Sequence, residues 1–179
     1  FGLNMIVHKG RTIFVGDTSV HEYPTSEQMA EMAISTARVV RLFGFEPKVA
    51  FVSHSTFGQP LTSRTKHIRN AVEILKERNV DFEFDGDMQP DVALNPEYEE
   101  LYPFSKIVGK ANILIMPGQH SAAISYKLMK TIGDTKVIGP LLIGLGLPIE
   151  IAPLRSSTSE IINLASIAAY SADVINYKK

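Results

Sequence analysis

The feature of this sequence that most constrains its fold is a repeated exchange between short β-rich runs and segments with helical periodicity. Compact apolar runs at residues 48–53 and 112–116 are typical of buried strands, and helix-length amphipathic segments separate them. We therefore predict an α/β domain with a parallel or mixed sheet and helices on both faces, because crossovers between parallel strands cover the sheet.

The remaining elements follow from local patterns. Residues 3–8 and 12–15, joined by Lys9-Gly10, are predicted to form a hairpin. A long helix is predicted to open at Pro24-Thr25, with Gln28 as the capping-box partner of Thr25. Further helices are predicted over residues 63–79, 91–101, 119–132 and 158–173, and further strands over residues 81–85, 137–145 and 149–152.

Composition excludes several classes of protein. The 179 residues carry a net charge of −1 and no cysteine, which excludes a disulfide scaffold, a thiolate zinc site and a cysteine nucleophile. Balanced charge argues against nucleic acid or an anionic membrane as partner, and no signal peptide is visible. We expect a cytoplasmic location. Because the sequence starts at Phe1, we expect a segment of a longer polypeptide.

Three loops follow predicted strands and lead into predicted helices, at residues 53–63, 117–121 and 153–158. Helix N-termini present free amide groups and a positive dipole end, so such loops favour an anion. The candidate ligand-binding residues on these loops and the adjoining helix are Ser53, Ser55, Thr56, Arg155, Ser156 and Glu160.

Other readings of the motifs are weaker. Ser53 to Thr56 also fits a turn that caps its own backbone, and no G-x-S-x-G elbow supports a nucleophilic serine. The histidines form no metal-binding pair, so we expect no metal site. Asp85, Asp87 and Asp91 surround Gly86, and a solvated turn is favoured there over a cation site.

Ordered motifs extend over nearly the whole chain. They are Asp17-Thr18 with Pro24-Thr25-Ser26-Glu27-Gln28, residues 48–55 (KVAFVSHS), 85–94 (DGDMQPDVAL), 110–117 (KANILIMP), 124–128 (ISYKL) and 138–142 (IGPLL). Together they resemble the C-terminal portion of phosphotransacetylases, the phosphate acetyl- and butyryltransferases. The resemblance implies two α/β lobes with an acyl-CoA site in the cleft between them. Residues 1–147 would form the second lobe and residues 148–179 a strand and helix returning to the first. It also implies a homodimer or larger homo-oligomer.

The resemblance further implies that the catalytic motif is lost. In the family, an Asn-Asp-Leu-Ser-Arg-Gly motif and a later aspartate hold phosphate, stabilise the oxyanion and accept a proton. The motif's serine falls at Pro153 and its arginine at Leu154, and the later aspartate falls at Glu160. Proline and leucine supply neither a hydroxyl nor a charge, so we expect no catalytic residue here.

This degeneration resembles the phosphotransacetylase-like domain of large NADP-dependent malic enzymes, as do the 53–55 loop and the 86–88 turn. The resemblance implies a regulatory domain that senses acetyl-CoA or a related acyl-CoA and holds no cofactor of its own. In the same chain, a malic-enzyme catalytic region would decarboxylate malate to pyruvate with NADP and a divalent metal. Two alternatives stay open: a phosphate acetyltransferase-type enzyme that uses Arg155 and Glu160, and an oligomerisation domain that binds no ligand.

Overall fold

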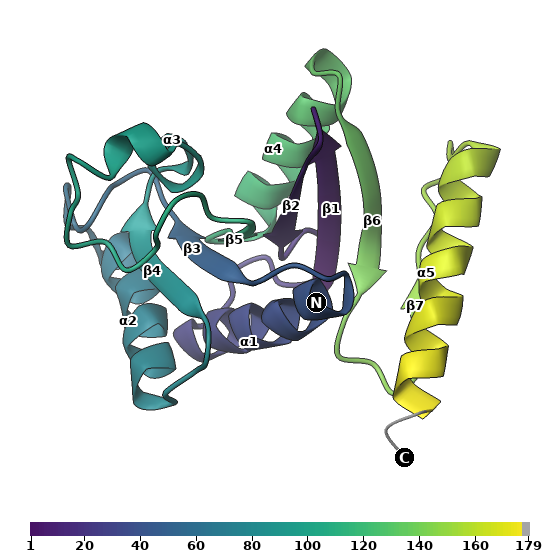
Figure 1. Ribbon diagram of the computed structural model, residues 1–179, viewed down its shortest axis with the longest axis horizontal. Coiled ribbons are helices and arrows are strands. Elements are labelled where there is room, and N and C mark those ends of the chain that lie inside the picture. The colour runs from purple at the N-terminus through teal and green to yellow at the C-terminus, as the bar shows by residue number, and fades with distance from the viewer. Residues whose placement is uncertain (177–179) are drawn as a thin grey trace.

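A mixed sheet of seven strands forms the centre of the protein, in the order β4-β3-β5-β2-β1-β6-β7 (Figure 1). The computed structural model describes the backbone of residues 1–176 and the side chains of residues 1–172. The strands are β1 Gly2–His8, β2 Arg11–Gly16, β3 Lys48–Val52, β4 Glu83–Met88, β5 Ile113–Ile115, β6 Lys136–Leu142 and β7 Ile149–Glu150. The helices are α1 Ser26–Leu42, α2 Ser63–Glu77, α3 Pro90–Leu94, the short 3-10 helix η1 Pro96–Tyr98, α4 Gln119–Ile132 and α5 Thr158–Asn176.

Strand direction divides the sheet into two parts. Strands β4, β3, β5 and β2 are parallel, so their carboxyl ends meet at one edge. Strand β1 is antiparallel to both β2 and β6, and β6 is antiparallel to β7. The predicted hairpin is confirmed, with Leu3 opposite Gly16 and His8 opposite Arg11. The predicted fold class, a mixed sheet in an α/β domain, is likewise confirmed.

Each face of the sheet packs against its own hydrophobic core. One core joins Leu3 and Phe14 of the sheet to apolar residues of α1 and α2. The other joins Ile6 and Leu114 to residues of α3 and α4. Because helices cover both faces, most of the strand positions are buried, as the near-continuous apolar runs predicted. Full burial of a side chain such as Phe14 contributes roughly 1.5–3 kcal/mol.

Local capping signals set several helix boundaries. The capping box of α1 is confirmed, with Thr25 accepting from the Gln28 N–H and Gln28 accepting from the Thr25 N–H. Helix α2 begins at Ser63, as the predicted range does, and its cap is Thr62, which forms a reciprocal capping box with Thr65.

The predicted helix over residues 91–101 is also wrong in extent. Helix α3 stops at Leu94, and Asn95 is extended (φ −122°, ψ 115°) before the short η1 begins at Pro96. Proline disfavours the α conformation in the residue before it and has no N–H to donate, so one continuous helix cannot pass through this point.

The C-terminal segment, which follows β6 from residue 143 onward, lies at the β6–β7 edge and is more exposed to solvent than the rest of the protein. Both predicted strands there are shorter than expected, since β6 ends at Leu142 and β7 has two residues. Helix α5 runs along this edge (Figure 1) and buries Leu164 in the core shared with α1. Exposed apolar residues accumulate nearby, namely Leu145, Leu147, Ile149, Ile151, Leu154, Ile161 and Ile162.

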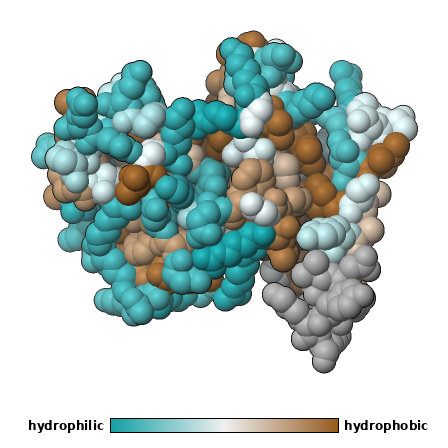
Figure 2. Space-filling view, in the orientation of Figure 1, coloured by the Kyte–Doolittle hydropathy of each residue, from teal (hydrophilic) through white to brown (hydrophobic). Residues whose placement is uncertain are grey.

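Figure 2 shows hydrophobic surface on this side of the molecule, facing α5. Helix α5 is long and rich in apolar residues, yet among residues 1–176 no helix has the length and hydropathy needed to cross a membrane.

Candidate functional site

The first group of candidate residues lies in the loop that follows β3. Ser55 is 0 % exposed, and its hydroxyl donates to the carboxylate of Asp87 at the end of β4. Thr56 Oγ1 accepts from the Gln89 N–H (3.2 Å), and Ser53 Oγ accepts from the Ser55 N–H (3.3 Å). These three hydroxyls are buried, and their hydrogen bonds hold the loop against β4.

Two residues of the predicted acidic cluster, Asp85 and Asp87, lie on β4 and are buried, so a solvated turn is wrong for them, whereas Asp91 is exposed on α3. Asp87 also accepts from the Gly58 N–H (3.1 Å). Asp85 accepts from the N–H groups of Lys106 (2.8 Å) and Gly86 (2.9 Å). Backbone N–H groups satisfy Asp85, and one backbone N–H together with the Ser55 hydroxyl satisfies Asp87. Within the part of the chain that the structure describes, no three His, Asp or Glu residues are grouped as metal ligands.

Asp17, at the end of β2, is a third buried carboxylate at this edge. It accepts from the N–H groups of Gly2 (2.8 Å), Ser19 (2.9 Å), Val20 (3.2 Å) and His21 (2.8 Å), and it contacts His21 Nδ1 (2.7 Å). Burial raises the pKa of Asp17, but these hydrogen bonds outweigh the effect and hold the pKa below its usual value. Asp17 therefore ties the start of β1 to the loop after β2.

The second group of candidates lies between β7 and α5. Arg155 is exposed. Ser156 Oγ is buried and finds no hydrogen-bond partner among the residues whose side chains are described. Pro153 offers no hydroxyl, and Leu154 is fully exposed to solvent. The two positions predicted to correspond to the family's serine and arginine thus contain no polar side chain.

Glu160 is bonded to both α4 and its own helix. Lys130 Nζ donates to Glu160 Oε1 (2.8 Å), the Ser157 N–H donates to Glu160 Oε2 (2.7 Å), and Ser157 Oγ accepts from the Glu160 N–H (3.3 Å). The hydrogen bonds from Lys130 and Ser157 lower the pKa of Glu160 to about 2. A carboxylate of such low pKa is a poor general base at neutral pH.

A cavity of about 170 Å³ lies between α4, β6 and the C-terminal segment, and part of the second group lines it. Ser156 and Glu160 line it beside Pro153, whereas Arg155 and the first group are not among its lining residues. Strands β5, β2 and β1 separate β3 from β6, so the two groups belong to different parts of the sheet. Their individual contacts with a ligand remain predictions.

Two charged residues of this cavity were missed in the sequence. Lys127 and Lys130 of α4 line it together with Tyr126, and their i, i+3 spacing places them on neighbouring parts of the helix surface. That spacing was the available signal, but it is also common on solvated helices. Only the tertiary structure, in which Lys130 contacts Glu160 at the start of α5, shows that these lysines face a cavity.

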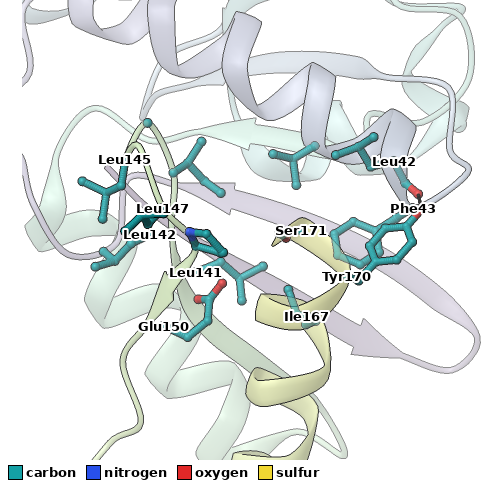
Figure 3. A pocket seen from close by; sticks show the side chains of 14 residues that line it. Leu42, Phe43, Leu141, Leu142, Leu145, Leu147, Glu150, Ile167, Tyr170 and Ser171 are labelled. Carbon is teal, nitrogen blue, oxygen red and sulfur yellow. Dashed lines mark hydrogen bonds between the residues drawn. The ribbon is translucent and has the colours of Figure 1, made fainter. Parts of the chain in front are cut away.

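A second pocket, of about 160 Å³, lies between the end of α1, the β6–β7 connection and α5 (Figure 3). Its lining is apolar except for Glu150, Tyr170 and Ser171, and Glu150 points into it (Figure 3). Glu150 Oε2 is buried without a partner among the described side chains. Burial raises the pKa of Glu150 to about 7, offset in part by a backbone hydrogen bond from Leu142. Tyr170 OH donates to the Leu42 carbonyl (3.2 Å).

Comparison with known proteins gives a consistent result. The chain is 47% identical over 171 residues to an NADP-dependent malic enzyme of Rhizobium meliloti (strain 1021), covering 96% of this chain and 22% of that protein. It is 36% identical over 162 residues to a phosphate acetyltransferase of Clostridium acetobutylicum, covering 89% of this chain and 49% of that protein. The chain thus spans less than a quarter of the first relative and about half of the second.

Solved structures show the same relationship. A phosphotransacetylase from Streptococcus pyogenes superposes with a TM-score of 0.90 at 32% identity, covering 96% of this chain and 53% of that one. A EutD phosphotransacetylase from Staphylococcus aureus gives a TM-score of 0.87 at 28% identity. The model of the phosphate acetyl/butaryl transferase family matches residues 2–169. The chain therefore belongs to the phosphate acetyl/butaryl transferase family.

Proposed function

We propose that this chain is the regulatory, acyl-CoA-sensing part of an NADP-dependent malic enzyme and does not itself catalyse acyl transfer. The observation that carries the proposal is the loop before α5. Pro153 and Leu154 stand where the family's serine and arginine are expected, and Glu160 is bonded to Lys130. Loss of one preorganised oxyanion donor costs on the order of 3 kcal/mol of transition-state stabilisation, so efficient transfer is not expected.

The identity to a malic enzyme supports the proposed parent protein. In that protein, a catalytic region in the same chain would oxidatively decarboxylate malate to pyruvate with NADP and a divalent metal, in the cytoplasm. Acetyl-CoA would be the effector. Residues 1–147 would form the second lobe of the phosphotransacetylase-like module and residues 148–179 its return to the first lobe. The exposed apolar residues of the C-terminal segment support this division, because a missing lobe would cover them.

We also propose that the parent protein self-associates as a homodimer or larger homo-oligomer. Helix α4 carries exposed Ile124, Leu128 and Ile132 at i, i+4 spacing, which makes one apolar stripe along the helix. A stripe of this kind is suited to packing against a second helix.

The test is made on the intact protein that contains this chain. NADP-dependent malate oxidation is measured while acetyl-CoA is titrated, and acetyl transfer from acetyl-CoA to phosphate is assayed in parallel. We expect acetyl-CoA to lower the rate of malate oxidation, with no detectable acetyl transfer. Because coupling between sites is reciprocal, bound malate and NADP should change acetyl-CoA affinity by the same factor as acetyl-CoA changes theirs.

Two results would replace the proposal. Phosphate-dependent acetyl transfer would favour the acyltransferase alternative. No measurable affinity for any acyl-CoA would favour a ligand-free oligomerisation domain.

A further inference from the structure

The apolar pocket between the end of α1, the β6–β7 connection and α5 contains a single carboxylic acid. Figure 3 shows the side chain of Glu150 directed into the pocket from β7. Most of the other lining residues are leucine, isoleucine, valine, phenylalanine and proline. Tyr170 is the one further residue of the described lining with a titratable side chain. A ligand in this pocket therefore meets apolar walls and one acidic group.

No positively charged group of the described lining neutralises Glu150. The lining residues include no lysine, arginine or histidine, and Glu150 Oε2 is buried without a partner among the described side chains. Tyr170 does not supply the missing donor, because its hydroxyl donates to the Leu42 carbonyl (3.2 Å). Buried polar groups without partners are rare in native proteins. Glu150 is therefore suited to a donor that enters the pocket on a ligand.

The charge of Glu150 decides which ligands suit the pocket. Burial raises the pKa of Glu150 to about 7, because the ionised form has lost water without gaining a counter-charge. A neutral ligand leaves that charge uncompensated, and an anion adds repulsion. A protonated amine or guanidinium supplies both a counter-charge and a hydrogen-bond donor, and such charge-assisted bonds are stronger than neutral ones.

The size of the pocket limits the body of the ligand. The pocket has a volume of about 160 Å³. A cavity of roughly 150 Å³ with leucine, isoleucine and phenylalanine walls holds one benzene molecule. Exposed Leu145 and Leu147 belong to the lining, so a first lobe that packs on them would place the pocket at a domain interface. Ligand sites are common at such interfaces.

We propose that this pocket binds a small organic cation, an amine or guanidinium on an apolar body about the size of one aromatic ring, with Glu150 as its counter-ion. The cationic group donates to Glu150 Oε2, and the apolar walls enclose the body. Tyr170 holds α5 against the end of α1 through its bond to Leu42 and so shapes one side of the pocket. The pocket shares no described lining residue with the cavity of Lys130 and Glu160. The inference therefore goes beyond the proposed acyl-CoA sensing and does not rest on it.

The test compares three ring compounds of similar size, whose binding to the intact protein is measured by calorimetry at pH 8. Benzylamine is cationic at this pH, benzyl alcohol is neutral and benzoate is anionic. We expect benzylamine to bind about tenfold more tightly than benzyl alcohol, as one hydrogen bond between charged groups allows, and benzoate not to bind measurably. Lowering the pH to 5 should weaken benzylamine binding, because Glu150 is then protonated.

Two variants test the pocket itself. Glu150→Gln keeps the shape of the side chain and should lower benzylamine affinity about tenfold, with benzyl alcohol changed by less than about twofold. The pH dependence of benzylamine binding should be lost in the same variant. Ile167→Trp fills the pocket from α5 and should weaken the binding of both compounds. Glu150→Gln preserves the test if Ile167→Trp does not fold.

Glu100→Gln is the matched control, because it removes an exposed carboxyl that does not line the pocket. It should leave benzylamine affinity unchanged. Equal affinities for benzylamine and benzyl alcohol would overturn the proposal, as would equal effects of Glu150→Gln and Glu100→Gln. Absence of binding by all three compounds would also overturn it, and is the result expected if a side chain from elsewhere in the intact protein already pairs with Glu150. Inhibition by acetyl-CoA is measured separately, so a failure here leaves the proposed function standing.

Discussion

Carboxylates at the two ends of the sheet have opposite environments. At the carboxyl ends of the parallel strands, hydrogen bonds within the protein satisfy Asp17, Asp85 and Asp87, and most of the donors are backbone N–H groups. At the β6–β7 edge, Glu150 is buried against apolar side chains with one oxygen unpaired among the described residues. The pKa of Asp17 is accordingly lowered and that of Glu150 raised.

The two parts of the protein differ in whether their buried carboxylates find hydrogen-bond partners within the chain. The parallel part pairs its buried carboxylates with donors of the same chain, so its loops are held in place by the chain itself. The β6–β7–α5 end leaves Glu150, Ser156 and several apolar residues without full partners in the described structure. We therefore expect mutations in the first part to act mainly on stability and those in the second to act mainly on binding and assembly.

The largest effect is expected for Asp17→Ala. This change removes the acceptor of four backbone N–H groups and of His21, and buried donors without acceptors are costly. We expect a loss of about 3–4 kcal/mol in the free energy of unfolding, measured by urea denaturation. Asp81→Ala, which removes an exposed partner of Arg41, serves as control and should change little. A similarly small loss of stability for Asp17→Ala would contradict the proposed difference between the parallel part of the sheet and its β6–β7–α5 end.

A smaller, pH-dependent effect is expected for Glu150→Gln. Below its usual pKa of 4.5, Glu150 is protonated in both the folded and the unfolded chain. As the pH rises to about 7, the unfolded chain ionises first, so folded stability falls through this window and stays lower above it. Allowing for the solvent-exposed part of the side chain, we expect Glu150→Gln to be about 1–2 kcal/mol more stable than the unmutated protein at pH 8. At pH 4 the two should be equally stable.

Thermal and urea unfolding at pH 4, 6 and 8 measure this effect. Glu100→Gln, which changes an exposed carboxyl, is the matched control. If the unmutated protein and Glu150→Gln lose the same stability between pH 4 and 8, Glu150 is not the group responsible for the pH dependence of stability.

The smallest effect is expected at the start of α5. Glu160→Ala removes both the cap with Ser157 and the ion pair with Lys130, whereas Glu160→Gln retains a capping oxygen. We expect Glu160→Ala to lose about 0.5–1 kcal/mol of stability and Glu160→Gln less than half of that. Chemical denaturation of both variants separates the cap from the ion pair, and equal losses would show that the ion pair dominates.

Much of the fold was predictable because the signals are local. Thr25 and Gln28 lie one turn apart and define the start of α1, and Gly133 ends α4 as the periodic pattern indicates. The missed features are also local in origin. Thr62 and Thr65 form a capping box without the usual glutamate or glutamine, and Pro96 divides a helix that its neighbours favour.

The candidate site was less predictable, since its groups are distant in the sequence. Ser55 and Asp87 are 32 residues apart and Lys130 and Glu160 are 30 apart, so no spacing rule links them. Ser53, Ser55 and Thr56 have residue types that suit a ligand, yet the structure shows their hydroxyls bonded within the protein.

The sequence by itself determined the alternation of strands and helices, the capping box of α1 and the absence of polar side chains at Pro153 and Leu154. These properties depend on side-chain chemistry within a few neighbouring positions. Tertiary structure alone decided the strand order, in which β5 lies between β3 and β2, and the placement of Lys127, Lys130, Ser156 and Glu160 around one cavity. Those outcomes depend on burial and hydrogen bonding summed over the whole molecule, where many arrangements share the same local pattern.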